Sequence, residues 1–189
     1  MFRVVGLVGI ALIGGALAAC ADAVTVRPTY IGSYDPNMLT YQAGQGAMKI
    51  EIFGNPFSAP KSALDDAVTG AMSGSIFGRP VQFATAVPPE NRSPYRVVLV
   101  VNPAKTLASD ELCRKSEYPT AGPAPTLRME AAFCADGQAL TATGGTVAGV
   151  QSADDPKFRT LVRQIALALF PIEDPNRDSE DRDIDFPAD

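Results

Sequence analysis

The 189-residue chain contains no His and no Trp, and its 16 Lys and Arg face 21 Asp and Glu. Without His, Ser-His-Asp and Cys-His catalysis are excluded, and the commonest metal ligand is missing. Residues 173–189 hold eight acids and two bases, and Arg3 is the one charged residue among residues 1–19. Residues 20–172 therefore hold 13 acids and 13 bases. A neutral body creates no strong field for nucleic acid, and we predict no nucleic-acid partner.

Residues 1–19 have the layout of a secretory signal, with Arg3 as their only charge, then an apolar run and small residues. The motif Leu17-Ala18-Ala19-Cys20 resembles the lipobox of bacterial lipoproteins. That resemblance implies cleavage before Cys20, a diacylglyceryl group on its thiol and an acyl chain such as palmitate on its amino group. These chains would anchor the protein stably in a membrane. We expect no other cofactor.

The alternative is a plain signal peptide, or a spanning helix, with a chance Cys. A spanning helix needs about 20 apolar residues, and this run is shorter. Among lipoproteins of enteric bacteria, Asp directly after the lipidated Cys causes retention in the inner membrane. Here Ala21 holds that position, and the first Asp is Asp22. We therefore predict the periplasmic face of the outer membrane of a Gram-negative host.

Residues 20–45 contain scattered Pro, Gly and Tyr with no sustained period. This composition favours a lipidated N-terminus and tether rather than part of a packed domain. The predicted domain then covers residues 46–172. The acidic, Pro-punctuated residues 173–189 are predicted to form a disordered tail.

The first half of the domain alternates between strand and helix patterns. Residues 48–53 place Met and Ile on one face and Lys and Glu on the other, which indicates a half-buried strand. Pro60 suits a helix start, and a helical stripe follows over residues 64–75. Residues 81–87 alternate again, and residues 95–101 form a continuous apolar run. We predict two strands there, joined by a polar loop.

The second half predicts a hairpin and a final helix. Asp136-Gly137 is a strong two-residue turn signal between strands at 127–133 and about 139–149. The pair Gly144 and Gly145 is interpreted as a bulge in the return strand. Asp155 suits a helix cap, and the apolar stripe that follows is ended by Pro171.

The predicted order is β-α-β-β-β-β-α. It indicates an α+β fold with an antiparallel sheet of about five strands and two helices packed on one face. The closing pattern from Asp155-Pro156-Lys157-Phe158 to Leu169-Phe170-Pro171 resembles lipoproteins of the domain-of-unknown-function 4136 type. This resemblance implies a small envelope lipoprotein and brings no catalytic residue.

Cys113 and Cys134 remain once Cys20 is assigned to lipid. In an oxidising compartment they are expected to form a disulfide. The closed loop of about 22 residues would stabilise the fold by roughly 3 kcal/mol. The alternative is a reactive or metal-binding thiol pair, but CxxC spacing and His are absent, and we predict no metal site.

Two patterns could hide chemistry. Ser58-Ala59-Pro60-Lys61 matches the S-x-x-K of penicillin-binding proteins, but the companion motifs are absent, which favours a helix start. Glu51 and Glu130 could serve a cell-wall glycan hydrolase, but both lie on strand faces that we expect to be solvated. We therefore predict no catalytic residue and no enzyme. Peptidoglycan is a possible binding partner.

Residues 102–125 form a long, Pro-rich connection with a possible short helix over residues 107–115, fixed at Cys113. Such a loop is either a recognition element or a structural strap over the sheet. For recognition, we predict contacts to an envelope protein through Leu107, Arg114 and Tyr118. The chain is thus expected to be a non-enzymatic binding or assembly accessory in the periplasm. The alternatives are a cell-wall enzyme and a binder of small apolar ligands between helices and sheet.

Overall fold

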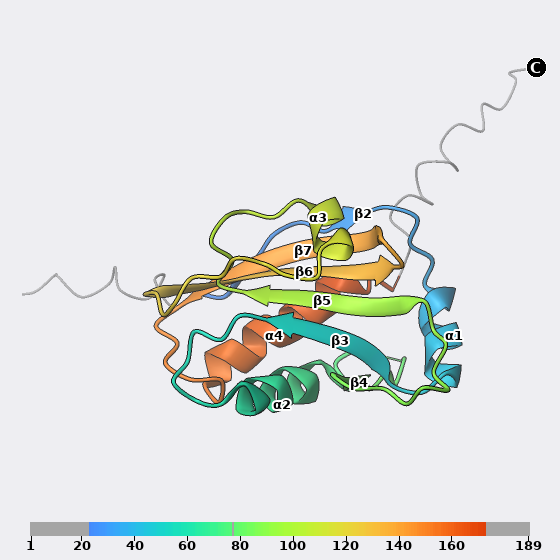
Figure 1. Cartoon of the computed structure of the whole chain (residues 1–189), viewed down its shortest axis with the longest axis horizontal. Coiled ribbons are helices and arrows are strands. Elements are labelled where there is room, and N and C mark those ends of the chain that lie inside the picture. Colours follow the sequence, from blue (N-terminus) through green and yellow to red (C-terminus); the bar gives the residue numbers. More distant parts are fainter. Residues whose placement is uncertain (1–22, 77, 173–189) are drawn as a thin grey trace, which may run out of the picture.

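The computed structural model describes residues 23–76 and 78–172. The predictions for the signal peptide, for Cys20 and for residues 173–189 lie outside these residues. The described residues form an α+β fold around one seven-stranded sheet (Figure 1). The elements are β1 (Thr25–Val26), β2 (Tyr30–Ile31), α1 (Asn37–Gly44), β3 (Met48–Phe53), α2 (Lys61–Met72), β4 (Phe83–Ala84), β5 (Tyr95–Val101), α3 (Ser109–Arg114), β6 (Thr126–Ala135), β7 (Gln138–Ala148) and α4 (Pro156–Leu169). No helix among them is long and apolar enough to cross a membrane.

The sheet is mixed, so the predicted all-antiparallel sheet of about five strands is wrong in detail, although the α+β class is confirmed. The strand order is β1-β7-β6-β5-β3-β4, and β2 also pairs with β7. Both β4 and β5 run parallel to β3, whereas β5, β6 and β7 are antiparallel neighbours. The crossover through α2 carries the chain back across the domain, so that β4 runs parallel to β3. Residues 85–94 carry it back once more, so that β5 is also parallel to β3.

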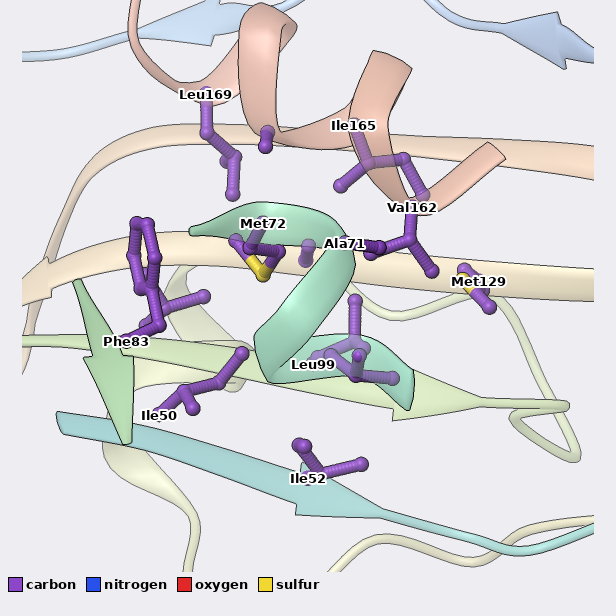
Figure 2. Close-up of a cluster of buried hydrophobic side chains, with 14 of the residues drawn as sticks. Ile50, Ile52, Ala71, Met72, Phe83, Leu99, Met129, Val162, Ile165 and Leu169 are labelled. Carbon is purple, nitrogen blue, oxygen red and sulfur yellow. The ribbon is translucent and has the colours of Figure 1, made fainter. Parts of the chain in front are cut away.

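One face of the sheet is covered by α2 and α4, as predicted. Figure 2 shows Met72 of α2 and Ile165 of α4 between the helices and the strand residues Ile50 and Leu99. The stripe of α4 is fully buried; its members are Phe158, Leu161, Val162, Ile165 and Leu169. The predicted cap is also confirmed, because the carboxylate of Asp155 accepts a hydrogen bond of 2.8 Å from the backbone N–H of Lys157.

The predicted tether is wrong for residues 25–44, which belong to the domain. Both β1 and β2 pair with the outer edge of β7, whose backbone groups would otherwise lack partners. The hydroxyl of Tyr34 donates to the carbonyl oxygen of Pro171 at 3.0 Å, and Leu39 of α1 is completely buried. The two strands are only two residues long and flank Pro28, so no alternation is visible in the sequence.

The hairpin at Asp136-Gly137 is confirmed, but the predicted bulge is in the wrong place. The register shift lies between Phe133 and Cys134, whereas Gly144 and Gly145 pair regularly. A Cβ on Gly145 would lie 2.6 Å from the carbonyl oxygen of Thr25 and 2.7 Å from the Leu161 side chain. The glycine therefore allows β1 and α4 to approach β7 closely.

Candidate functional site

The second face of the sheet is covered by residues 102–125, which we call the strap. α3 is its only helix, and it packs against β6 and β7 (Figure 1). Strap and sheet together bury a second apolar cluster. Its members are Val98, Val100, Leu107, Leu112, Cys113, Tyr118, Ala132, Cys134, Ala139 and Ala142. The long loop is thus an integral layer of the domain.

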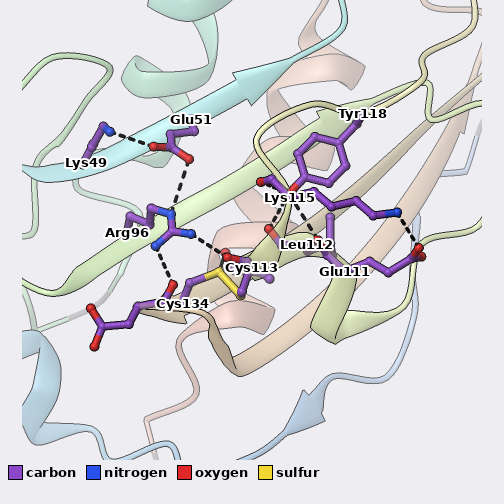
Figure 3. A network of polar contacts seen from close by, with 11 residues as sticks. Lys49, Glu51, Arg96, Glu111, Leu112, Cys113, Lys115, Tyr118 and Cys134 are labelled. Carbon is purple, nitrogen blue, oxygen red and sulfur yellow. Dashed lines mark hydrogen bonds and ion pairs between the residues drawn. A yellow bond between two sulfur atoms is a disulfide. The ribbon is translucent and has the colours of Figure 1, made fainter.

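The predicted disulfide between Cys113 and Cys134 is confirmed, and it joins α3 to β6 across a Cα–Cα distance of 5.7 Å. Arg96 of β5 fixes this junction (Figure 3). Its guanidinium donates to the carbonyl oxygens of Cys113 and Asp136, both at 2.6 Å, and lies 3.3 Å from the carboxylate of Glu51. A lone Arg at the start of an apolar strand is the only sequence signal for this role.

Two of the three predicted partner-binding residues are buried within the domain. Leu107 is 6% exposed and Tyr118 is 8% exposed, so each offers a partner only a small part of its side chain. The Tyr118 ring packs edge-on against Phe53 at 4.7 Å between centroids, and burial raises the pKa of its hydroxyl. Arg114 is exposed, 3.4 Å from Asp110. The structure therefore favours the strap interpretation of the loop over the recognition interpretation.

The S-x-x-K pattern sits where a helix starts. Lys61 is the first residue of α2, and its amine forms an ion pair with Asp65 one turn later. Ser58 lies in the exposed part of the preceding loop. Glu51 is on the strap face of β3, where its carboxylate accepts a hydrogen bond of 2.7 Å from Lys49. Lys61 and Glu51 are thus each held in an ion pair with a neighbouring side chain.

A cleft lies between the strap and the N-terminal strand segment, and we call it the Glu130 cleft. It consists of two cavities of about 350 and 210 Å³ that share Arg27 and Glu130. The lining residues are Thr25, Arg27, Pro28, Tyr30, Leu107, Ser109, Leu112, Arg128, Glu130, Ala142, Thr143, Gly145 and Thr146. Glu130 is the only acid among them.

Glu130 is 2% exposed and forms an ion pair with Arg27, which is itself half exposed. Burial raises the pKa of the Glu130 carboxyl, and the nearby Arg27 guanidinium opposes that shift. Gly144, opposite Glu130 on β7, leaves room for the pair, since a Cβ there would lie 2.5 Å from the carboxylate oxygen. This carboxylate is therefore held inside the protein by a residue that comes from the N-terminal segment.

The prediction that Glu130 faces solvent is wrong. Its face of β6 is covered by the strap and by the N-terminal segment that carries Arg27. The sequence predicts that this N-terminal segment is a tether outside the domain, so nothing in the prediction covers Glu130. A sequence signal for burial exists, because Glu130 interrupts an otherwise apolar run and two adjacent glycines follow on the return strand. Those glycines make room for the ion pair and for close packing rather than forming a bulge.

No family model matches the sequence, and no curated protein matches it. Among solved structures, the chain is similar to a dodecamer of a single-substitution PelC variant from Paraburkholderia phytofirmans, with 12% identity, a TM-score of 0.43 and coverage of 78% of this chain and 98% of that chain. A second PelC dodecamer structure from the same organism gives 11% identity, a TM-score of 0.41 and coverage of 80% and 100%. Similarity this low carries no conclusion about the site or the function.

Proposed function

We propose that the protein is a lipid-anchored envelope protein that binds a partner or ligand at the Glu130 cleft and does not catalyse a reaction. The lipobox at Cys20 supports the proposed anchor, and Ala21 in the position after it supports a location on the outer membrane. The disulfide fits an oxidising compartment such as the periplasm. The single observation that carries the binding role is the buried, Arg27-paired Glu130 in an otherwise acid-free cleft.

The same observation weighs against the cell-wall enzyme. Glycan hydrolysis commonly uses two carboxyl groups separated by roughly 5–9.5 Å, one as acid and one as base or nucleophile. The residues that line the Glu130 cleft offer one carboxyl, and an ion pair with Arg27 already occupies it. Peptidoglycan turnover that is lost in the Glu130→Gln variant would contradict this assignment.

The lining of the cleft indicates what it would bind. Leu107, Leu112 and Ala142 supply an apolar wall, while the half-exposed guanidinium of Arg27 offers hydrogen-bond donors beside it. An amphipathic group fits this pattern, with an apolar part and an oxygen-rich acceptor, such as an exposed segment of an envelope protein. The ring of Tyr30 is half exposed beside the cleft and would touch such a partner first.

Site-specific photo-cross-linking in intact cells tests the binding site. Tyr30 and Tyr41 are a matched pair, because each is 50% exposed and only Tyr30 lines the Glu130 cleft. We expect a photoreactive phenylalanine at position 30 to capture a defined partner that mass spectrometry can identify. The same probe at position 41 should capture little. Equal or stronger capture at position 41 would contradict the site.

Fractionation of the same cells tests the anchor. The wild-type protein should co-sediment with outer membranes, because acyl chains on Cys20 hold it there. The Cys20→Ala variant should be released or mislocalised. If that variant fractionates unchanged with the membrane, the proposed anchor is wrong.

A further inference from the structure

Three loops meet at the end of the sheet where β3 and β5 finish and β6 begins. They comprise residues 54–60, 119–125 and 149–155, and we call this region the loop end (left side of Figure 1). Members of all three loops, among them Phe57, Ala124 and Val150, line one cavity of about 480 Å³. The loops therefore form one continuous surface.

The cavity at the loop end is lined by no Asp, Glu, Lys or Arg. The charged residues of this end lie at its margin, with Asp154 and Asp155 just before α4 and Lys61 at the start of α2. The opposite end of the sheet carries charged residues in the connections that flank α1, β5 and the β6–β7 hairpin. These residues are Asp35, Glu90, Arg92 and Asp136. The cavity lining at the loop end is therefore the less costly surface to bring out of water, because charged groups are the costliest to desolvate.

The loop end has a fixed shape. Asn102 adopts a left-handed backbone conformation with φ of 49°, and its side-chain amide donates to the carbonyl oxygen of Gly122 at 3.0 Å. The carbonyl oxygen of Asn102 accepts from Ala121 at 2.7 Å, and the backbone N–H of Gly149 donates to Pro125 at 3.0 Å. Contact with another surface would therefore cost little additional ordering.

The N-terminal segment enters the domain at this same end. Thr25 pairs with Thr146, and continuing that antiparallel register places Ala23 beside Ala148, directly before the loop at 149–155. Cys20 precedes Ala23 by three residues, which span at most about 10 Å when extended. A lipid on Cys20 would therefore lie close to the loop end.

We propose that the loop end rests on the lipid head-group surface of the membrane that holds the anchor. The proposal depends on the proposed lipid anchor at Cys20. The occupant is a lipid surface rather than a protein because the anchor is so short and the cavity lining at the loop end has no charge to desolvate. The chain leaves the described domain at the opposite end, where Pro171 contacts Tyr34, and the acid-rich residues 173–189 follow from there. This arrangement starts the acidic stretch far from an anionic lipid surface.

Fluorescence quenching in vesicles tests the orientation. The chain has no Trp, so a single introduced Trp reports on one position. Ala124→Trp at the loop end and Ala43→Trp on α1 are matched, because both alanines are exposed and lie at opposite ends of the domain. Each variant, purified from membranes in its lipidated form, is reconstituted in phosphatidylethanolamine and phosphatidylglycerol vesicles that contain a lipid quencher near the head groups.

We expect blue-shifted, strongly quenched emission for Ala124→Trp and unquenched emission for Ala43→Trp. Protein that floats with the vesicles but shows equal quenching at both positions, or none at either, would overturn the orientation and leave the anchor intact. Protein that fails to float would contradict the anchor, and the orientation with it. Stronger quenching of Ala43→Trp would show that the other end faces the lipid.

Discussion

The two faces of the sheet are covered by different means. On the helix face, α2 and α4 present continuous apolar stripes to a large hydrophobic cluster, and the buried Thr141 hydroxyl donates to the carbonyl oxygen of Leu169. On the strap face, an irregular segment is held by a disulfide, by Arg96 and by the buried hydroxyl of Tyr118, and it leaves the Glu130 cleft beside it. The strap of irregular backbone leaves a cleft beside it and admits the buried charge of Glu130, whereas the helix face buries no charged side chain among the described residues. The strap face is therefore where binding is expected.

Matched Leu→Ala substitutions should reveal the largest difference between the two faces. Leu161 of α4 is completely buried and Leu107 of the strap is 6% exposed and borders the cleft. We expect Leu161→Ala to lower the free energy of unfolding by about 4 kcal/mol and Leu107→Ala by about 2 kcal/mol, because truncation in a closed core leaves a larger empty cavity. Urea denaturation measures both. Equal losses would mean that the two faces are packed equally well.

Loss of the disulfide should destabilise the protein by roughly 3 kcal/mol, since the bond restricts the unfolded chain. The double variant Cys113→Ala with Cys134→Ala removes the bond without leaving a lone thiol. Denaturation midpoints of oxidised wild type and the double variant give the difference. A midpoint unchanged from wild type would show that packing alone holds the strap.

Removal of Arg27 should cost about 2 kcal/mol, less than for a fully buried pair because Arg27 is half exposed. The cost arises because Glu130 stays buried without its partner. Glu130→Gln in the Arg27→Ala background should recover part of the loss, because the amide carries no charge. A double-mutant cycle in urea checks this. If the second substitution adds further destabilisation, Glu130 is not a buried anion.

The smallest expected effects are two pH dependences on the strap face. Burial raises the pKa of Glu130 in the folded protein above 4.5, so the unfolded chain loses this proton at a lower pH than the folded chain does. The free energy of unfolding therefore falls as pH rises from 4.5 through the pKa of Glu130 in the folded protein. Hydrogen bonds from Lys115 and from the Ala108 amide lower the Glu111 pKa to about 2, so its stabilisation is present above 4.5 and is lost as pH falls toward 2.

Glu130→Gln should flatten the stability profile only above pH 4.5, and Glu111→Gln only below it. Thermal unfolding in a buffer series separates the two windows. The assigned pKa shifts would be contradicted if Glu130→Gln changed the pH dependence of stability below pH 4.5 or if Glu111→Gln changed it above pH 4.5.

The helix face could be predicted from the sequence because its information is local. The stripe of α4, its Asp155 cap and the Asp136-Gly137 turn each lie within a few residues. The strap face depends on long-range partners. Arg27 reaches Glu130 across 103 positions, and the two short strands that flank it show no period. The disulfide is the exception, since compartment and cysteine count alone predict it.

The intact mass of the protein, extracted from membranes without reduction, decides whether it is a lipid-anchored envelope protein. We predict a chain that begins at Cys20, carries a diacylglyceryl group and an amide-linked acyl chain, and is two hydrogens lighter because Cys113 and Cys134 are joined. A chain that retains residues 1–19, or that begins at an unmodified Cys20, would contradict the lipid-anchored envelope protein proposed above.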